Sequence, residues 1–151
     1  MALYLVQHGK NLPKEEDPDK GLSAEGRAEV ERMAALAKGH ELTVPAVKHS
    51  GKKRARETAE IFARALGSGE GIEEIKGLGP LDDVTQLEER SEGNVMLVGH
   101  LPFMEKLTAH LVAGDADKAP VFKFQNSGIV CLKSDEDKGW YIAWALMPHI
   151  E

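Results

Sequence analysis

Residues 3–9 read Leu-Tyr-Leu-Val-Gln-His-Gly, an apolar run that ends in a polar turn. The run Leu3–Val6 is apolar and β-prone, so it predicts a buried first strand. A second run, Asn94–Val98, is followed in the same way by Gly99 and His100. Continuous apolar strands are typical of parallel sheets that helices cover on both faces. The two runs therefore predict an α/β fold in which a histidine follows each of two buried strands.

Segments with helical spacing separate these strands. Ser23 predicts the N-cap of a first helix that ends at Gly39. The apolar stripe from Ala55 to Leu66 predicts a second helix, and Pro102 suits the first turn of a third that reaches Val112. Further strands are expected at Pro45–Val47, Gly71–Lys76, Gly128–Leu132 and Trp140–Leu146.

The order of these elements predicts a three-layer α/β/α sandwich, with a mostly parallel sheet and one antiparallel strand. The last two strands form a hairpin, and Trp140 and Trp144 are expected on one face of its second strand, packed in the core. Asp82 or Asp83 is expected to cap a short helix that runs to about Arg90. Residues 1–151 are the length of one ordinary domain, and nothing in the composition divides them.

Composition excludes several classes of function. The net charge of −6 argues against a general affinity for nucleic acid, and no apolar stretch is long enough to span a membrane. The N-terminus has no secretory signal, and the one cysteine, Cys131, allows no internal disulfide, so a cytoplasmic protein is expected. Basic residues nevertheless gather in one short stretch, where they suit a local anionic ligand or a solvated helix start: Lys48, Lys52, Lys53, Arg54 and Arg56.

Polar residues follow three of the predicted strands. Open α/β sheets bind ligands outside the carboxyl ends of their strands. Gln7, His8 and Gly9 follow the first strand, and His100 follows the strand 94–98. Arg54 lies one turn into the helix after the strand 45–47. We therefore expect two imidazoles and one guanidinium to converge at one edge of the sheet.

Five stretches in order resemble the histidine phosphatase superfamily, whose fold is phosphoglycerate mutase-like. Leu5–Gly9 is similar to its Arg-His-Gly signature, and Val98–Pro102 to its second-histidine motif. Ser50–Thr58 is similar to its Ser-Pro-x-x-Arg-Ala-x-x-Thr segment. Lys20–Gly26 and Leu78–Asp83 resemble segments of the SixA-type phosphohistidine phosphatases, a branch that the short chain also suits.

This resemblance implies a metal-independent phosphatase without a cofactor. His8 would attack phosphorus and become phosphorylated, Arg54 would grip the equatorial oxygens, and His100 would donate as an imidazolium. Oxyanion contacts are expected from four further residues: Gln7, Gly9, Ser50 and Lys20. Asp83 or Asp82 is a candidate general acid, although a helix cap explains either carboxylate equally well. The expected partner is a protein that carries phosphohistidine, as in signal transduction.

One departure weakens this expectation, because Gln7 stands where the family has arginine. An arginine would bind a phosphate through two charge-assisted hydrogen bonds, and their loss corresponds to a fall in the reaction rate of roughly 10²–10³-fold. The charge would be restored by Lys10, Lys20, Lys52 or Lys53, but a lysine cannot form the two parallel hydrogen bonds of arginine. Two alternatives stay open: a non-catalytic or weakly active module that binds phosphorylated ligands, and a phosphatase for small phosphate esters.

Overall fold

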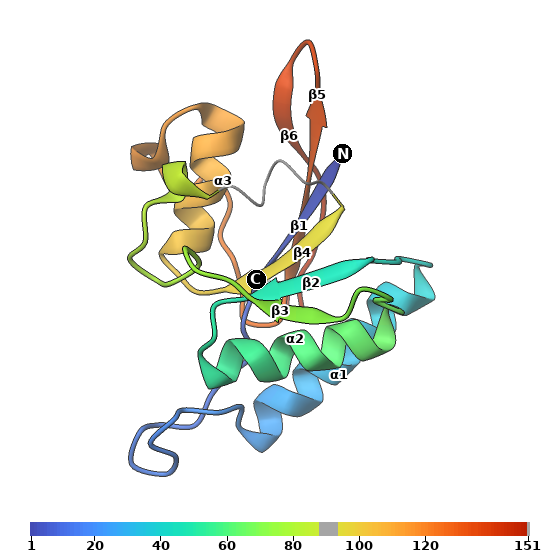
Figure 1. Ribbon diagram of the computed structural model, residues 1–151, viewed down its shortest axis with the longest axis vertical. Helices are drawn as coiled ribbons and strands as arrows, with labels where there is room; N and C mark the ends of the chain where they lie inside the picture. The colour runs from blue at the N-terminus through green and yellow to red at the C-terminus, as the bar shows by residue number, and fades with distance from the viewer. Residues whose placement is uncertain (88–93, 151) are drawn as a thin grey trace.

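The computed structural model describes residues 1–87 and 94–150 (Figure 1). Within these residues, one six-stranded sheet has the strand order β3-β2-β4-β1-β5-β6. The strands are β1 (Ala2–Gln7), β2 (Ala46–His49), β3 (Ile72–Glu74), β4 (Val95–Gly99), β5 (Ile129–Asp135) and β6 (Gly139–Leu146). Strands β1 to β4 are parallel, whereas β5 is antiparallel to both β1 and β6. The predicted sheet, mostly parallel with one antiparallel strand, is confirmed.

Helices cover both faces of this sheet. Helices α1 (Ala24–Gly39) and α2 (Lys53–Ala65) lie together on one face, and α3 (Phe103–Ala113) lies on the other (Figure 1). Side chains of β1 alternate between the two layers, as the pleat requires. Val6 and Tyr4 pack in the cluster with α1 and α2, whereas Leu3 and Leu5 pack in the cluster with α3. The three-layer α/β/α architecture is therefore confirmed.

The helix ends follow from local chemistry. The Ser23 side chain accepts a hydrogen bond from the Gly26 amide, as an N-cap does, and Glu25 lies in the first turn of α1. Gly114 ends α3 with a left-handed φ of 75°, which glycine adopts without strain. The three predicted helices are found within about two residues of their expected bounds.

Two sequence expectations are wrong in detail. Asp83 caps only a three-residue 3₁₀ turn, η1 (Val84–Gln86), and the expected helix end near Arg90 lies outside the described residues. The paired register of β5 and β6 shifts between Cys131 and Leu132. This bulge turns Trp140 toward the α3 layer and Trp144 toward the α1–α2 layer, so the two rings lie on opposite faces.

Cys131 is buried in the sheet, as a small apolar side chain would be. Among residues 1–87 and 94–150, no helix combines the length and the apolar character that crossing a membrane would require.

A further 3₁₀ turn, η3 (Ala116–Lys118), follows α3 on the same side of the sheet.

The carboxyl ends of β1, β2 and β4 meet at one edge, because the three strands are parallel and lie close together in the sheet. The polar residues that follow these strands are thereby brought to one place.

Candidate active site

His8 and His100 are placed by the register of two neighbouring strands. Gln7 of β1 pairs with Gly99 of β4, and each histidine is the next residue along its strand. The His8 amide donates to the Gly99 carbonyl at 3.0 Å, which extends the pairing by one step. The two imidazole rings lie with their centroids 5.0 Å apart and are tilted by 53°. The predicted convergence of the two histidines is therefore present.

Arg54 completes the group from the first turn of α2. Its Nε donates to Nε2 of His8 at 3.4 Å. Because a guanidinium can only donate, Nε2 of His8 is the unprotonated nitrogen. The other ring nitrogen, Nδ1, lies 2.7 Å from the Gly9 carbonyl and donates its proton there. His8 therefore presents the lone pair of Nε2 toward the guanidinium.

Thr58 ties this helix to the turn that carries His8. Its hydroxyl donates to the Arg54 carbonyl at 2.7 Å and accepts the Gly9 amide at 3.0 Å. The Gly9 amide is thus used by the protein itself, which differs from its expected role against the phosphate. Packing explains the glycine instead, because a Cβ at residue 9 would lie 2.6 Å from Val30 of α1.

The imidazole of His8 is kept neutral by its surroundings. Burial, helped by the positive charges of Arg54 and Lys20, lowers the pKa of His8 to about 4 against the opposing hydrogen bond to the Gly9 carbonyl. A neutral imidazole keeps a free lone pair, which is the form that can act as a nucleophile at neutral pH.

His100 is buried beside Ser50. The Ser50 hydroxyl lies 2.6 Å from Nε2 of His100, which places the predicted Ser50 in the site. Burial, followed by the positive fields of His8, Arg54, Lys52 and Lys20, lowers the pKa of His100 to about 3. With protein groups alone around it, His100 is neutral, not the imidazolium that the sequence comparison implied. A bound dianion would raise this pKa again.

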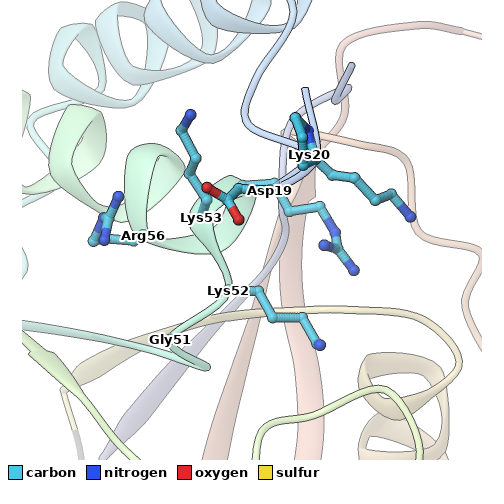
Figure 2. Close-up of a pocket in the computed structure, with 8 residues that line it drawn as sticks. Asp19, Lys20, Gly51, Lys52, Lys53 and Arg56 are labelled. Atoms are coloured by element: carbon cyan, nitrogen blue, oxygen red, sulfur yellow. The ribbon is translucent and has the colours of Figure 1, made fainter. Parts of the chain in front are cut away.

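A cleft beside Arg54 carries strong positive charge, and we call it the basic cleft. It has a volume of about 440 Å³ and is lined by Pro18, Asp19, Lys20, Gly51, Lys52, Lys53, Arg54 and Arg56. Figure 2 shows the side chains of Lys20 and Lys52 extending to one side of this cleft, while those of Lys53 and Arg56 point elsewhere. Arg54 joins the cleft to the histidine pair.

The lysines that were expected to replace the missing arginine fall into two groups. Lys10 is paired with Glu25 and Lys53 with Asp17, each at 2.9 Å. Lys20 and Lys52 instead act on the site, since both contribute to the lowered pKa of His100. Of the four lysines, these two therefore supply positive charge near the histidine pair.

Helix α2 also fixes the loop that presents Lys20. Asp17 of this loop accepts hydrogen bonds from Lys53, from the Gly21 amide and from the Asp19 amide, and these lower its pKa to about 2. Lys20 itself has a φ of 54°, a left-handed backbone that lysine rarely adopts. Such strain is typical of residues that the surrounding structure holds for a function.

Gln7 does not reproduce an arginine. Its Oε1 atom is buried and has no hydrogen-bond partner among the described residues. An amide that is buried without a partner weakens the fold. The Gln7 side chain therefore supplies a neutral dipole at the position where the family has the positively charged guanidinium of an arginine.

Asp82 and Asp83 are used by their own loop. Asp82 accepts the Gly79 amide at 2.7 Å, and Asp83 accepts the amide and hydroxyl of Thr85. The bonds to Thr85 lower the pKa of Asp83, which is the opposite of what a general acid needs. Among the described residues, no carboxylate is hydrogen-bonded to the group of His8, Arg54 and His100.

The sequence analysis gave two residues no role in the site. Thr58 was named only as the last residue of the motif Ser50–Thr58 and within the apolar stripe of α2, and Asn126 was not singled out. The Asn126 side chain donates to the His8 carbonyl at 2.8 Å. No pattern around Asn126 marks it, because the contact joins residues that are 118 positions apart.

The part of the chain that the structure describes contains no cluster of three or more His, Cys, Asp or Glu side chains suited to hold a metal ion. The two histidines, the guanidinium and the two lysines instead form a setting for an oxyanion. Such a setting can neutralise the charge of an oxyanion that lies beside an imidazole lone pair.

Solved structures similar to this chain include phosphatases of several kinds. One, described as the protein histidine phosphatase SixA complexed with tungstate, superposes with a TM-score of 0.84 at 27% identity over 98% of this chain and 97% of that chain. A SixA protein from Agrobacterium tumefaciens gives a TM-score of 0.76 at 29% identity, covering 97% of each chain. A mycobacterial glucosyl-3-phosphoglycerate phosphatase with VO3 gives 0.76 at 14% identity, over 97% of this chain and 99% of that chain, which shows the fold alone.

A sequence search of curated proteins finds no match. The model of the histidine phosphatase superfamily (branch 1) matches residues 3–82, which are more than half of the chain and include His8 and Arg54. This match, together with the shared fold, shows that the chain belongs to the histidine phosphatase superfamily, branch 1.

Proposed function

We propose that this protein removes the phosphoryl group from a phosphorylated histidine in a partner protein, with residues 1–151 acting as one domain. The observation that carries the proposal is the orientation of His8. Its Nδ1 proton is held by the Gly9 carbonyl, and its Nε2 lone pair faces the Arg54 guanidinium. A phosphoryl group bound by Arg54 would therefore meet the nucleophilic nitrogen.

The first step forms a bond between Nε2 of His8 and phosphorus. The P–N bond to the substrate imidazole breaks, and its electron pair returns to that nitrogen. Because the substrate ring is already protonated on its other nitrogen, it leaves as a neutral molecule. Arg54, with Lys20 and Lys52, neutralises charge on the transferring oxygens.

Water then attacks the phosphorus of phosphorylated His8. The bond from phosphorus to Nε2 breaks, His8 returns to its neutral form with the proton still on Nδ1, and dihydrogen phosphate is released. Neither step requires a general acid. This agrees with the use of Asp82 and Asp83 by their own loop, and it favours a phosphoramidate over an alkyl phosphate.

The test is phosphate release from a phosphorylated histidine phosphotransfer domain. We expect His8→Ala to abolish release, and the exposed control His40→Ala to leave it unchanged. Rapid quenching at alkaline pH should trap an acid-labile phosphoryl group on the wild-type protein. Equal rates for wild type and His8→Ala would end the proposal.

Gln7 favours a second candidate, a module that binds phosphorylated proteins without turnover. Calorimetry with the same phosphorylated domain separates the two functions. Binding without any His8-dependent release supports the second candidate, and any His8-dependent release excludes it. A small phosphate ester tested beside the domain shows whether turnover extends to substrates that need an acid.

A further inference from the structure

The basic cleft carries cations beyond those that lie near the histidine pair. Five lysine and arginine side chains line it, with Asp19 as the one carboxylate among the lining residues. Two of the five are paired within the chain, Lys53 with Asp17 at 2.9 Å and Arg56 with Glu60 at 3.5 Å. The clustering of cations is local, because the whole chain has a net charge of −6.

This charge opposes the stability of α2. Within the described residues of its first turn the helix has no acid, and its N-cap Lys52 makes no capping bond with its side chain. Cations at a helix N-terminus are unfavourable, because the backbone dipole is positive there. Helix α1 follows the favourable pattern, with Ser23 and Glu25 at its start. An anionic ligand would offset the penalty that α2 carries.

The cations of the basic cleft divide into an inner group, which lies near the histidine pair, and an outer group, which is exposed to solvent. Lys20 and Lys52 are inner, since both contribute to the lowered pKa of His100. Arg56 is outer, and its side chain is 49% exposed. Its partner Glu60 lies 3.5 Å away on the same helix and is 44% exposed. Surface pairs of this kind contribute little, so Arg56 can exchange Glu60 for an external carboxylate.

We propose that the outer part of the basic cleft, around Arg56, docks acidic side chains of the protein that carries the phosphohistidine. This inference rests on the proposed function. Figure 2 shows Arg56 directed away from the side toward which Lys20 and Lys52 extend. Cations that face different sides match the separate carboxylates of a protein surface better than one compact polyanion.

The test measures binding in the background of His8→Asn, so that turnover does not interfere. The probes are a histidine phosphotransfer domain of net negative charge, phosphorylated on its histidine, and free phosphohistidine. Arg56→Glu is the test variant. Arg64→Glu, an exposed arginine in the last turn of the same helix, carries the matched change of charge. Thermal melts confirm that both variants are folded.

Arg56→Glu is expected to raise the Kd for the phosphorylated domain about tenfold, and Arg64→Glu less than about twofold. The Kd for free phosphohistidine should change with neither variant. Raising NaCl from about 50 to about 300 mM should weaken binding of the domain more than binding of free phosphohistidine.

Three outcomes would overturn the docking proposal. The first is an equal Kd for the domain in both variants. The second is tighter, Arg56-dependent binding of inositol hexakisphosphate than of the domain, which assigns the cleft to compact polyanions. The third is binding of free phosphohistidine without binding of the domain. Arg56-dependent binding without His8-dependent hydrolysis would instead support docking and end the proposed activity.

Discussion

His8 and His100 are two buried imidazoles that the fold keeps neutral. Their pKa values are about 4 and about 3, against about 6.5 in an unfolded chain. Well above pH 6.5 neither ring binds a proton in either state. Below pH 6.5 the unfolded chain takes up protons that the folded protein does not. The free energy of unfolding must therefore decrease as the pH falls through this window.

We expect the free energy of unfolding to decrease between pH 6.5 and pH 4, with His8 alone contributing up to about 3 kcal/mol. The variant His8→Asn lacks one of the rings whose pKa the fold lowers, so its stability should depend less on pH. Urea unfolding at pH 7, 5.5 and 4.5 measures both slopes. The same slope for the two proteins would contradict the assignment to His8.

Gln7 marks a position where activity can be gained. Gln7→Arg places beside His8 a guanidinium that can form two charge-assisted hydrogen bonds. Under the proposed function we therefore expect kcat/KM on a phosphorylated histidine domain to increase at least tenfold and by no more than about 10²–10³-fold. Gln7→Lys should give a smaller gain, because lysine offers charge without a fork. Steady-state kinetics of the three proteins check this. No gain for Gln7→Arg would mean that Lys20 and Lys52 already supply what the site needs.

For single residues, the sequence predicted where the site residues lie better than it predicted their protonation and their hydrogen bonds. His8, Arg54 and His100 were expected together because each follows a strand or opens a helix at the same edge. The protonation of His100 and the partner of the Gly9 amide were not predictable. Both depend on burial and on side chains of α2, which no local pattern encodes.

The first residues of helix α2 place positive charge where a capping side chain would make the helix more stable. Lys52 has the extended backbone of an N-cap, with φ −68° and ψ 140°, but its side chain cannot accept a hydrogen bond. Aspartate or serine at this position would cap the helix and suit its dipole.

Lys52→Asp is therefore expected to stabilise the protein by about 0.5–2 kcal/mol and to lower kcat/KM by about tenfold. Lys52→Ala removes the charge without adding a cap, so it should lower kcat/KM without the gain in stability. Thermal unfolding and steady-state kinetics of both variants give the two quantities. If Lys52→Asp is as active as wild type, Lys52 does not contribute to the site.

The strands and helices themselves were largely predictable, because their apolar periods and caps are local. The bulge in the β5–β6 hairpin was not. One extra residue in β6 turns Trp144 to the face opposite Trp140, and the uninterrupted alternation of the sequence gives no sign of it. Packing against two different layers determines the register there.

Across the whole molecule, three distant parts of the chain hold the turn of His8 and Gly9. Strand β4 accepts a hydrogen bond from the His8 amide, and Thr58 accepts one from the Gly9 amide. The side chain of Asn126 donates a hydrogen bond to the His8 carbonyl. His8 is thus held through its backbone as well as through its ring.

Asn126→Ala removes one of these supports and leaves the His8 carbonyl without it. We expect a loss of about 1–2 kcal/mol in stability and a fall of about fivefold in kcat with little change in KM. Gln86→Ala, an exposed amide on η1, is the control. Chemical denaturation and single-turnover phosphorylation of His8 measure the effects. A change confined to stability would show that Asn126 has no part in positioning.

The in-register pairing of β1 with β4 has a consequence for how this molecule can change over time. The spacing between the two imidazoles is determined by hydrogen bonds of the backbone, in the most deeply buried part of the sheet. Replacements in the loop 13–19, which is mostly exposed and contributes Pro18 and Asp19 to the basic cleft, would change the lining of that cleft without moving Nε2 of His8. The cleft can therefore diverge in evolution while the arrangement of the two imidazoles is inherited unchanged.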